Sequence, residues 1–408
     1  MLSYNKLKIS EPDYIFILCV FILLIAGLTA IYSASFQLDK GDMQSNFYRQ
    51  LTWVAIGLVF MIVVYLVPSR TLYSTAYLFY GISILLLILT LFSNGDGKVS
   101  RWLSVAGIQF QPAEIAKIGT LLALARYLAQ NRRNLENVKE IGVSFGIVLM
   151  PFLLIIKQPD LGTSLVFLAM ALPLLYWAGL SAFKIFIITA PILVLFASFN
   201  FYSFFLLMII IASVLFYQKK SLVVSLLLFV INISVGIATP LLWNQLRDYQ
   251  KHRILTFLGM EIDPYGLSYQ VIQSKVAIGS GGFLGKGILN GTQTQLRFLP
   301  AQHTDFVFSV IGEELGFLGS FIIICLFFFL LLRGIYIASI IKNRFLSLIT
   351  IGTVVVLGFH VIVNIGMTIG IMPVTGLPLP LLSYGGSFTI VSLALIGIIL
   401  HTSARRYV

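Results

Sequence analysis

Residues 291–332 read GTQTQLRFLPAQHTDFVFSVIGEELGFLGSFIIICLFFFLLL. A polar, glycine-rich segment ends at Asp305, and a largely apolar run, long enough to cross a bilayer, follows from Phe306 to Leu332. A charge at a membrane boundary costs free energy unless it is solvated, paired or used. The stretch therefore predicts a transmembrane helix with a candidate functional carboxylate just before it.

The composition of the whole chain agrees with this interpretation. Hydrophobic residues make up 59% of its 408 residues, charged residues make up 10%, and the mean hydropathy is +0.98. Soluble domains are roughly 45–50% apolar and about 25% charged. Cys19 and Cys325 each lie inside an apolar run, which favours small buried hydrophobes over a disulfide. The chain is predicted to be an integral membrane protein.

Apolar runs of near-membrane length predict an all-α polytopic membrane protein with about twelve transmembrane helices, in a single domain over residues 1–408. The spans Lys184–Phe199 and Tyr202–Tyr217 form either a hairpin of two helices or one broken element. The other ten predicted spans are Tyr14–Ser35, Leu51–Val67, Leu72–Phe92, Pro112–Ala129, Ile141–Lys157, Gly162–Ala178, Leu222–Trp243, Phe306–Leu332, Phe345–Ile371 and Ser383–Thr402.

The distribution of Lys and Arg predicts the orientation of these spans. With the N-terminus inside, the inner loops hold Lys6, Lys8, Arg70, Arg132, Arg133, Lys139, Lys184, Lys219, Lys220, Arg333, Lys342, Arg344, Arg405 and Arg406. The short outer loops hold only Lys40, Arg49, Lys98 and Arg101. Both termini are therefore expected in the cytoplasm, with the large loop 244–305 outside. The net charge of +12 is then mainly a topology signal that also attracts anionic lipid, and no soluble basic surface for nucleic acid is expected.

One predicted helix carries an ionisable stripe near the outer surface. Gln111, Glu114 and Lys117 recur every three residues and share a helical face, behind a proline suited to a first turn. Glu114 and Lys117 can pair locally, which lowers the cost of bringing both into the membrane. Two interpretations remain open: a salt bridge that pins the helix, or a polar stripe that lines a cavity.

Two further segments are candidate binding sites with an alternative structural explanation, and two other candidate sites are excluded. Asp160 either caps the next helix at Thr163 or has a role in binding. The segment 372–387 has too much Pro and Gly for continuous helix, so it forms either a re-entrant loop able to hold an anion or a plain outer connection. The segment 279–287 lacks the spacing of a nucleotide-binding phosphate loop. The four histidines are too dispersed to suggest zinc.

Several of these blocks, in order along the chain, resemble the SEDS family of polytopic peptidoglycan glycosyltransferases (shape, elongation, division and sporulation). The blocks are Phe110–Lys117, Gln158–Thr163, Asp263–Tyr269, Gln273–Gly279, His303–Phe306, Gly312–Gly316 and Pro380–Ser387. Gly291–Pro300 and Gly376–Pro380 look more like the elongation member, RodA, than the division member, FtsW. Family members have ten spans, so residues 180–221 are expected to be an inserted helical hairpin.

The resemblance implies an enzyme that polymerises lipid II into β-1,4 glycan strands on the outer face of the bacterial cytoplasmic membrane, for cell elongation and shape. It implies that Asp305 is the catalytic base that activates the acceptor hydroxyl. The leaving diphosphate needs cations. The candidate substrate-binding residues are Arg101, Lys117, Arg49, Lys275, Glu114, Asp160 and Ser383. Mg²⁺ or Mn²⁺ is a candidate cofactor, and Asp160, Glu114 and Asp305 are candidate ligands of which none is selected.

The resemblance also implies a partner, a class B penicillin-binding protein. The main alternative function is a lipid II flippase or transporter, which shares the polar intramembrane residues and the polyprenyl substrate. Such transporters carry paired broken helices in two related halves, and the sequence has no convincing internal repeat. A scaffold that only anchors partners would not need Arg101, Glu114, Lys117 and Asp305 together.

Overall fold

The computed structural model describes residues 13–36, 44–92, 101–105, 108–130, 135, 137–218, 222–245, 251, 267–296 and 298–405. The topology residues Lys6, Lys8, Lys40, Lys98, Arg132, Arg133, Lys219, Lys220 and Arg406 lie outside these ranges, as do most of residues 246–266. The chain divides into two compact units. The first contains Met1–Ala178 and Ile262–Val408, and the second contains Gly179–Glu261.

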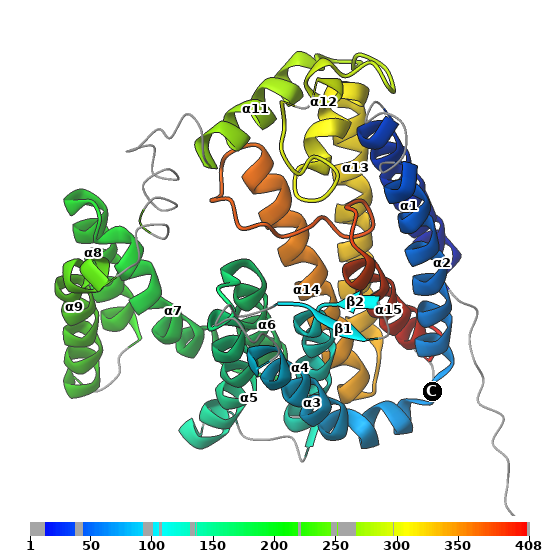
Figure 1. Ribbon diagram of the computed structural model, residues 1–408. Helices are drawn as coiled ribbons and strands as arrows, with labels where there is room; N and C mark the ends of the chain where they lie inside the picture. The colour runs from blue at the N-terminus through cyan, green and yellow to red at the C-terminus, as the bar shows by residue number, and fades with distance from the viewer. Residues whose placement is uncertain are drawn as a thin grey trace, which may run out of the picture. The chain divides into compact units, whose positions relative to one another are not determined.

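Helices occupy all twelve segments in which the sequence predicts them (Figure 1). In the first unit these are α1 (Tyr14–Phe36), α2 (Gln44–Leu66), α3 (Ser69–Phe92), α4 (Pro112–Ala129), α5 (Val138–Ile156), α6 (Leu161–Trp177), α13 (Val307–Ile340), α14 (Arg344–Thr368) and α15 (Gly386–Ser403). In the second unit they are α7 (Ala182–Ala197), α8 (Phe201–Tyr217) and α9 (Leu222–Gln245). The predicted all-α polytopic fold is confirmed.

Among the described residues, eight helices are long and apolar enough to cross a membrane: α1, α2, α3, α5, α9, α13, α14 and α15. The helices α6, α7 and α8 are equally apolar but shorter, and the 18-residue α4 carries Glu114, Lys117 and Arg126. Large apolar side chains on the outward faces of α1, α2 and α3 are exposed, as expected for surfaces that contact lipid. Cys325 on α13 is exposed as well, so the prediction that it is buried is wrong, because it lies on such a face.

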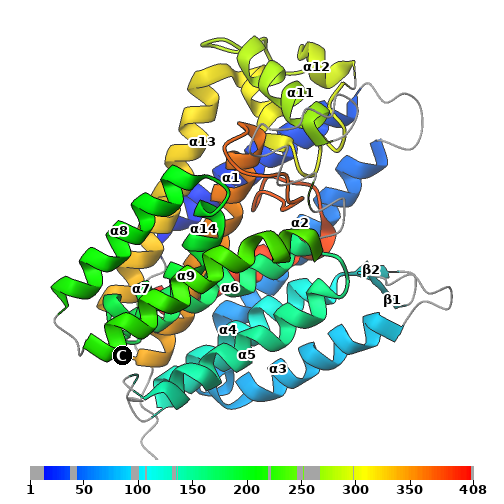
Figure 2. The ribbon, with the colours of Figure 1, turned by 90° about the vertical axis from the view of Figure 1, so that its left-hand side faces the viewer.

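The centre of the first unit is formed by α14 and α15. Of the residues in the most apolar 18-residue stretch of each helix, 78% and 83% are buried. Helices α4, α6 and α13 pack on α14, and α2 packs along α15 (Figures 1 and 2). Helix α14 is therefore in contact with elements from the first and last thirds of the chain. This arrangement places its polar side chains inside the protein rather than in lipid.

Some structure in this unit was not predicted. Strands β1 (Leu103–Val105) and β2 (Ile108–Phe110) form a small antiparallel hairpin before α4. Two helices, α11 (Leu267–Ser280) and α12 (Thr292–Gln295), lie in the long connection predicted to be extracellular. Helix α11 is fixed by Ser274, whose hydroxyl donates to the Thr368 carbonyl at 2.6 Å.

Helix α13 is interrupted at Gly316, where φ is 64° and ψ is −160°. The glycine-rich segment 281–287 packs against this break, and the Phe317 amide donates to the Gly282 carbonyl at 2.9 Å. A Cβ at Gly316 would lie only 2.3 Å from the Gly285 amide nitrogen. Glycine is required at position 316 both by the left-handed backbone conformation and by the close approach of the backbone of residues 283–285.

A buried carboxylate holds the next part of the same connection. Glu313 accepts hydrogen bonds from Lys286 Nζ at 2.8 Å, from the Gln293 amide at 2.8 Å, and from the amide and hydroxyl of Thr294 at 3.0 and 2.8 Å. Its side chain is fully buried. The Lys286 and Gly287 amides also donate to the Glu313 and Glu314 carbonyls at 3.0 Å, so residues 286–294 are attached to α13 through both the Glu313 side chain and the backbone.

The segment between α14 and α15 is non-helical, as its Pro and Gly content predicts. Its side chains Leu377, Leu379, Leu382 and Ser383 are at most 1% exposed. Such burial is not expected of a plain surface connection. The segment runs through the protein interior beside the turn that precedes α13.

The second unit is a three-helix cluster, formed by α7, α8 and α9. Its core contains Ala190, Val194, Met208, Ile211 and Leu215. Residues 184–217 form two separate helices rather than one broken element, and the side chain of Asn200 caps α8 by accepting from the Tyr202 and Ser203 amides. This unit begins at Gly179, beside the predicted start of the insertion, but it also includes α9. The insertion at 180–221 stays a prediction.

Candidate active site

Asp305 lies in a turn, residues 301–306, immediately before α13. Three neighbouring carbonyls in this turn accept hydrogen bonds from other segments. Asn364 Nδ2 on α14 donates to the Asp305 carbonyl at 2.8 Å, Ser383 Oγ donates to the Thr304 carbonyl at 2.5 Å, and the Tyr384 amide donates to the His303 carbonyl at 2.9 Å. The backbone around Asp305 is therefore fixed from two directions, and its side chain is left for other contacts.

Asp160 is the N-cap of α6, at the corner between α5 and α6. Its Oδ1 accepts from the Thr163 amide at 3.1 Å, so the predicted cap is confirmed. Its Oδ2 accepts from Thr163 Oγ1 at 3.0 Å and from Gln111 Nε2 at 3.1 Å. Because Gln111 immediately precedes α4, the Asp160 carboxylate joins the start of α4 to the start of α6.

The carboxyl groups of Asp305 and Asp160 lie close enough to interact. Burial raises the pKa of Asp305 above its ordinary value, and the charge of Asp160 raises it further, while a hydrogen bond from Thr304 lowers it. A Cβ at Gly376 would lie 3.5 Å from Asp305 Oδ2, so the carboxylate rests over a backbone position without a side chain. The nearby charge of Asp160 thus adds to burial in favouring the protonated form of Asp305.

Arg101 is the predicted cation that the structure places beside Asp160. Its Nε donates to the Gln158 carbonyl at 3.0 Å and its Nη2 to the Pro159 carbonyl at 2.5 Å, directly before Asp160 in the chain. The side chain is otherwise exposed. A guanidinium has five N–H donors, so several remain for an anionic ligand.

Lys117 lies deeper along α4 and is only 1% exposed. Its Nζ lies 2.7 Å from Glu114 Oε1 and 3.0 Å from His360 Nε2 on α14, and 5.5 Å from the ring centroid of Phe388. The predicted Glu114–Lys117 pair is confirmed. The buried Glu114 Oε2 has no hydrogen-bond partner within the part of the chain that is described. The geometry favours the salt-bridge interpretation, and substrate binding by these residues stays a prediction.

The remaining predicted substrate-binding residues are spread around the turn. Ser383 is buried, and its hydroxyl donates to Thr304 and accepts from the Leu379 amide. Arg49 is exposed on α2, next to Gln50, whose side chain binds the Gly385 amide. Lys275 is exposed on α11, with its aliphatic end against Gly370. None of these three contacts Asp305 through its side chain in the described structure, and their roles stay predictions.

The carboxylates near Asp305 can be compared with the ligands that a divalent cation requires. Among the described residues, no group of three or more His, Cys, Asp or Glu side chains is placed to hold a metal. Asp160 and Asp305 are nevertheless near enough for the charge of Asp160 to raise the pKa of Asp305, and Mg²⁺ is commonly held by one or two carboxylates together with substrate phosphates. Glu114 is paired with Lys117 instead. Asp160 and Asp305 are therefore suited to a divalent cation whose remaining ligands are oxygens of the substrate diphosphate.

A family model covering nearly the whole chain matches in two overlapping parts. The model FTSW_RODA_SPOVE, described as "Cell cycle protein", matches residues 13–205 and 182–407. The chain belongs to this family. The SEDS resemblance inferred from the sequence blocks is confirmed.

Characterised relatives align over almost their full length. The chain is 38% identical to "Peptidoglycan glycosyltransferase MrdB" of Escherichia coli strain K12, covering 97% of this chain and 94% of that protein. It is 33% identical to "Peptidoglycan glycosyltransferase RodA" of Treponema pallidum, covering 98% and 99%. The predicted RodA-like character is supported by both names.

Solved structures agree with the fold. A chain in the structure titled "Structural coordination of polymerization and crosslinking by a peptidoglycan synthase complex" is 31% identical, covers 97% of this chain and 99% of its own, and has a TM-score of 0.73. The rod shape determining protein RodA of Thermus thermophilus is 27% identical, covers 98% of each chain, and has a TM-score of 0.64. These matches confirm an integral protein of the bacterial inner membrane.

Sequence reasoning missed two residues of the site, His360 and Asn364. They are spaced four apart on α14, so they share one face, and one binds Lys117 while the other binds the Asp305 carbonyl. Polar side chains at i and i+4 inside an apolar run were the available signal. His360 was considered only as a zinc ligand, for which the histidines were too dispersed.

Proposed function

We propose that this peptidoglycan glycosyltransferase polymerises lipid II with Asp305 as its general base. The observation that supports the proposal is the Asp305 carboxyl, anchored through its backbone before α13, with a pKa raised by burial and by Asp160. A general base works best when its pKa lies near the operating pH. A solvent-exposed aspartate, with a pKa of about 3.9, would be a weaker base.

In the proposed reaction, the hydroxyl of an acceptor sugar attacks the anomeric carbon of a lipid-linked donor. Asp305 takes the hydroxyl proton as the new C–O bond forms, and the bond between the anomeric carbon and the diphosphate oxygen breaks. The lipid diphosphate leaves with the electron pair of that bond. Its growing charge needs a cation, and Arg101, held beside Asp160, is the best-placed candidate.

A divalent cation fits the same arrangement. Asp160 would hold Mg²⁺ or Mn²⁺ together with the substrate diphosphate, which leaves the Asp305 carboxylate to act as the base, and the cation would neutralise charge on the diphosphate as it leaves. The Gln111 amide keeps one Asp160 oxygen oriented, which supports a ligand role for that carboxylate. Lys117 is assigned instead to the support of α4 and α14, because both of its partners are buried with it.

The orientation and partner belong to the same proposal. The excess of Lys and Arg in one set of loops supports cytoplasmic termini, with Asp305 on the outer face. The similar synthase complex, whose title couples polymerisation to crosslinking, supports a class B penicillin-binding protein as partner. The RodA-like relatives support a role in cell elongation and shape.

The test is polymerisation of labelled lipid II by the purified protein in the presence of Mg²⁺ or Mn²⁺. The variant Asp305→Asn should fold and give no glycan chains. Asp13→Asn is a matched control, because Asp13 is a buried carboxylate at the start of α1 whose partner is Arg333. Glycan chains from Asp305→Asn would refute the assignment of the base. Transbilayer movement of lipid II without polymer would favour the flippase instead.

A further inference from the structure

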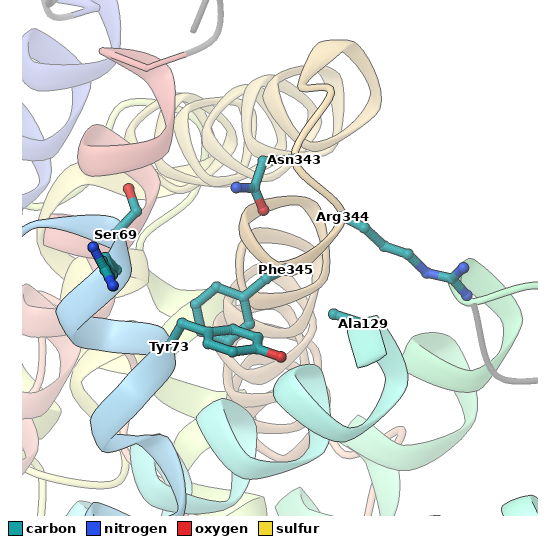
Figure 3. A pocket seen from close by; sticks show the side chains of 7 residues that line it. Ser69, Tyr73, Ala129, Asn343, Arg344 and Phe345 are labelled. Carbon is teal, nitrogen blue, oxygen red and sulfur yellow. The ribbon is translucent and has the colours of Figure 1, made fainter. Parts of the chain in front are cut away.

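A pocket of about 500 Å³ lies between three separate helix ends of the first unit (Figure 3). The turn from α2 to α3, the end of α4 and the turn from α13 to α14 meet there. The lining residues are Ser69, Arg70, Tyr73, Ala129, Asn343, Arg344 and Phe345. No part of the proposed polymerisation uses any of them.

The pocket lies at the end of the helices opposite to Asp305. Helix α13 starts beside Asp305 and reaches the pocket only after Ile340. Helix α14 starts at the pocket with Arg344 and comes to the Asp305 turn at Asn364, twenty residues later, which is roughly 30 Å along the helix. The pocket is therefore a separate site, close to the other surface of the membrane.

The charge of the pocket is positive. Of the seven lining residues two are arginines and none is acidic. Arg344 Nη2 donates to the Ala178 carbonyl at 2.8 Å, which fixes the side chain without neutralising it. Within the described ranges neither Arg70 nor Arg344 forms an ion pair with a carboxylate.

Two helix N-termini add to this field. Ser69 begins α3 and Arg344 begins α14, where Asn343 is the N-cap. The first N–H groups of a helix attract anions, and the helix dipole has its positive end there. Arg70 and Arg344 border the same cavity as these two N-termini, and the Arg344 guanidinium extends from it towards the Ala178 carbonyl (Figure 3). Together these groups make a stronger anion site than any one of them alone.

An aromatic wall completes the pocket. The rings of Tyr73 and Phe345 meet edge to face with centroids 5.2 Å apart, and Figure 3 shows them side by side. Arg126 stacks on the Tyr73 ring at 4.8 Å, so a third guanidinium lies behind it. Topology alone would explain positive charge at this surface, but it does not require a cavity with polar groups from three elements.

We propose that this pocket binds the phosphate-bearing headgroup of an anionic phospholipid, of the phosphoglycerol class. The phosphate oxygens would accept hydrogen bonds from the arginines and from the N–H groups at the helix N-termini. The glycerol hydroxyls would bind the Tyr73 hydroxyl and Asn343 Nδ2, because Asn343 Oδ1 caps α14. The Ser69 hydroxyl, 2.9 Å from His401 Nε2, has capacity for a further hydrogen bond. A volume of about 500 Å³ is within the range of small-ligand sites. Basic pockets between membrane helices suit such headgroups, and the acyl chains would extend into the bilayer.

The experiment uses the full chain in nanodiscs of phosphatidylcholine with a small fraction of phosphatidylglycerol. Bound phosphatidylglycerol is measured by native mass spectrometry, as a function of that fraction. Arg70→Gln and Arg344→Gln should each weaken binding by about five-fold, as expected for the loss of one charge near a lipid phosphate. Lys342→Gln is the matched control, because Lys342 is exposed in the same turn but does not line the pocket.

An equal loss with Lys342→Gln would overturn the proposal, since general surface charge would then explain the binding. Unchanged binding in Arg70→Gln would also overturn it, and this variant is safe for folding because Arg70 is exposed. Competition with inorganic phosphate and glycerol phosphate distinguishes the source of the anion. Retention of bound phosphatidylglycerol in millimolar inorganic phosphate or glycerol phosphate supports a lipid site, and its displacement by either soluble anion would overturn the lipid assignment.

Discussion

His360 and Asn364 lie one turn apart on α14 and connect the two charged parts of the candidate active site. His360 contacts Lys117 Nζ at 3.0 Å, and Asn364 donates to the Asp305 carbonyl at 2.8 Å. Both side chains are at most 1% exposed. Helix α14 therefore fixes the distance between the buried ion pair and the proposed base.

Asp305→Asn should stabilise the protein at neutral pH. The folded-state pKa of Asp305 is raised, so its contribution to stability is present at low pH and is lost as pH rises through that pKa. An uncharged Asn avoids this loss. The variant should have the higher Tm near pH 7, and the difference should shrink as the pH is lowered. A variant that is less stable at pH 7 would contradict this expectation.

The activity of the natural enzyme should fall as pH decreases through the raised pKa of Asp305, because a protonated carboxyl cannot accept the hydroxyl proton. Asp160→Asn should move the acidic limb of the pH–rate profile to lower pH, since it removes a nearby like charge. Asn at 160 can still cap α6. An unmoved acidic limb would show that the two carboxyl groups are not coupled.

Glu114→Gln and Lys117→Met should each be strongly destabilising, by about 3–5 kcal/mol, because each leaves one buried partner uncompensated. The double variant should lose much less than the sum. The measurement is a double-mutant cycle from unfolding of the purified protein, with polymerisation followed in parallel. Additive losses of stability would contradict the structural pair. Stable single variants that lose only polymerisation would return Lys117 to substrate binding.

Glu313→Gln should release residues 286–294 from α13, because the charged acceptor of Lys286 and of three groups in Gln293 and Thr294 is lost. Amide hydrogen exchange in that segment should accelerate. Glu314→Gln is the comparison, since the side chain of Glu314 accepts only from Ser33 and the Leu289 amide among the described residues. If the amides of residues 286–294 exchange equally slowly in both variants, contacts other than the Glu313 side chain hold this segment on α13.

Much of the fold could be predicted from local signals. Apolar runs located the helices, and Pro112, two residues before Glu114 and five before Lys117, correctly marked the first turn of α4. Strands β1 and β2 were missed because three residues are too few to show an alternating pattern. The long helix α13 was predicted to end at Leu332, before the charged Arg333, but it continues to Ile340. Arg333 pairs with Asp13, so its charge is compensated within the helix and does not end it.

The site was predictable in part, and for a physical reason. Asp305, Asp160 and Arg101 stand out as charges beside apolar runs, which is costly without a role. Their meeting depends on how the turn before α13, the corner before α6 and the hairpin before α4 pack together. Asn364 and Gln50 are uncharged, so their roles as anchors of Asp305 and of the segment before α15 needed the tertiary structure.

The turn that carries Asp305 is held through the carbonyl groups of His303, Thr304 and Asp305, and none of these bonds uses the side chain at 305. The reactive group and its support are thus chemically independent. A different side chain at this position would be presented from the same place. Substrate complexes that turn over too quickly to observe could be captured with such a replacement, and they would still report the geometry of the natural enzyme.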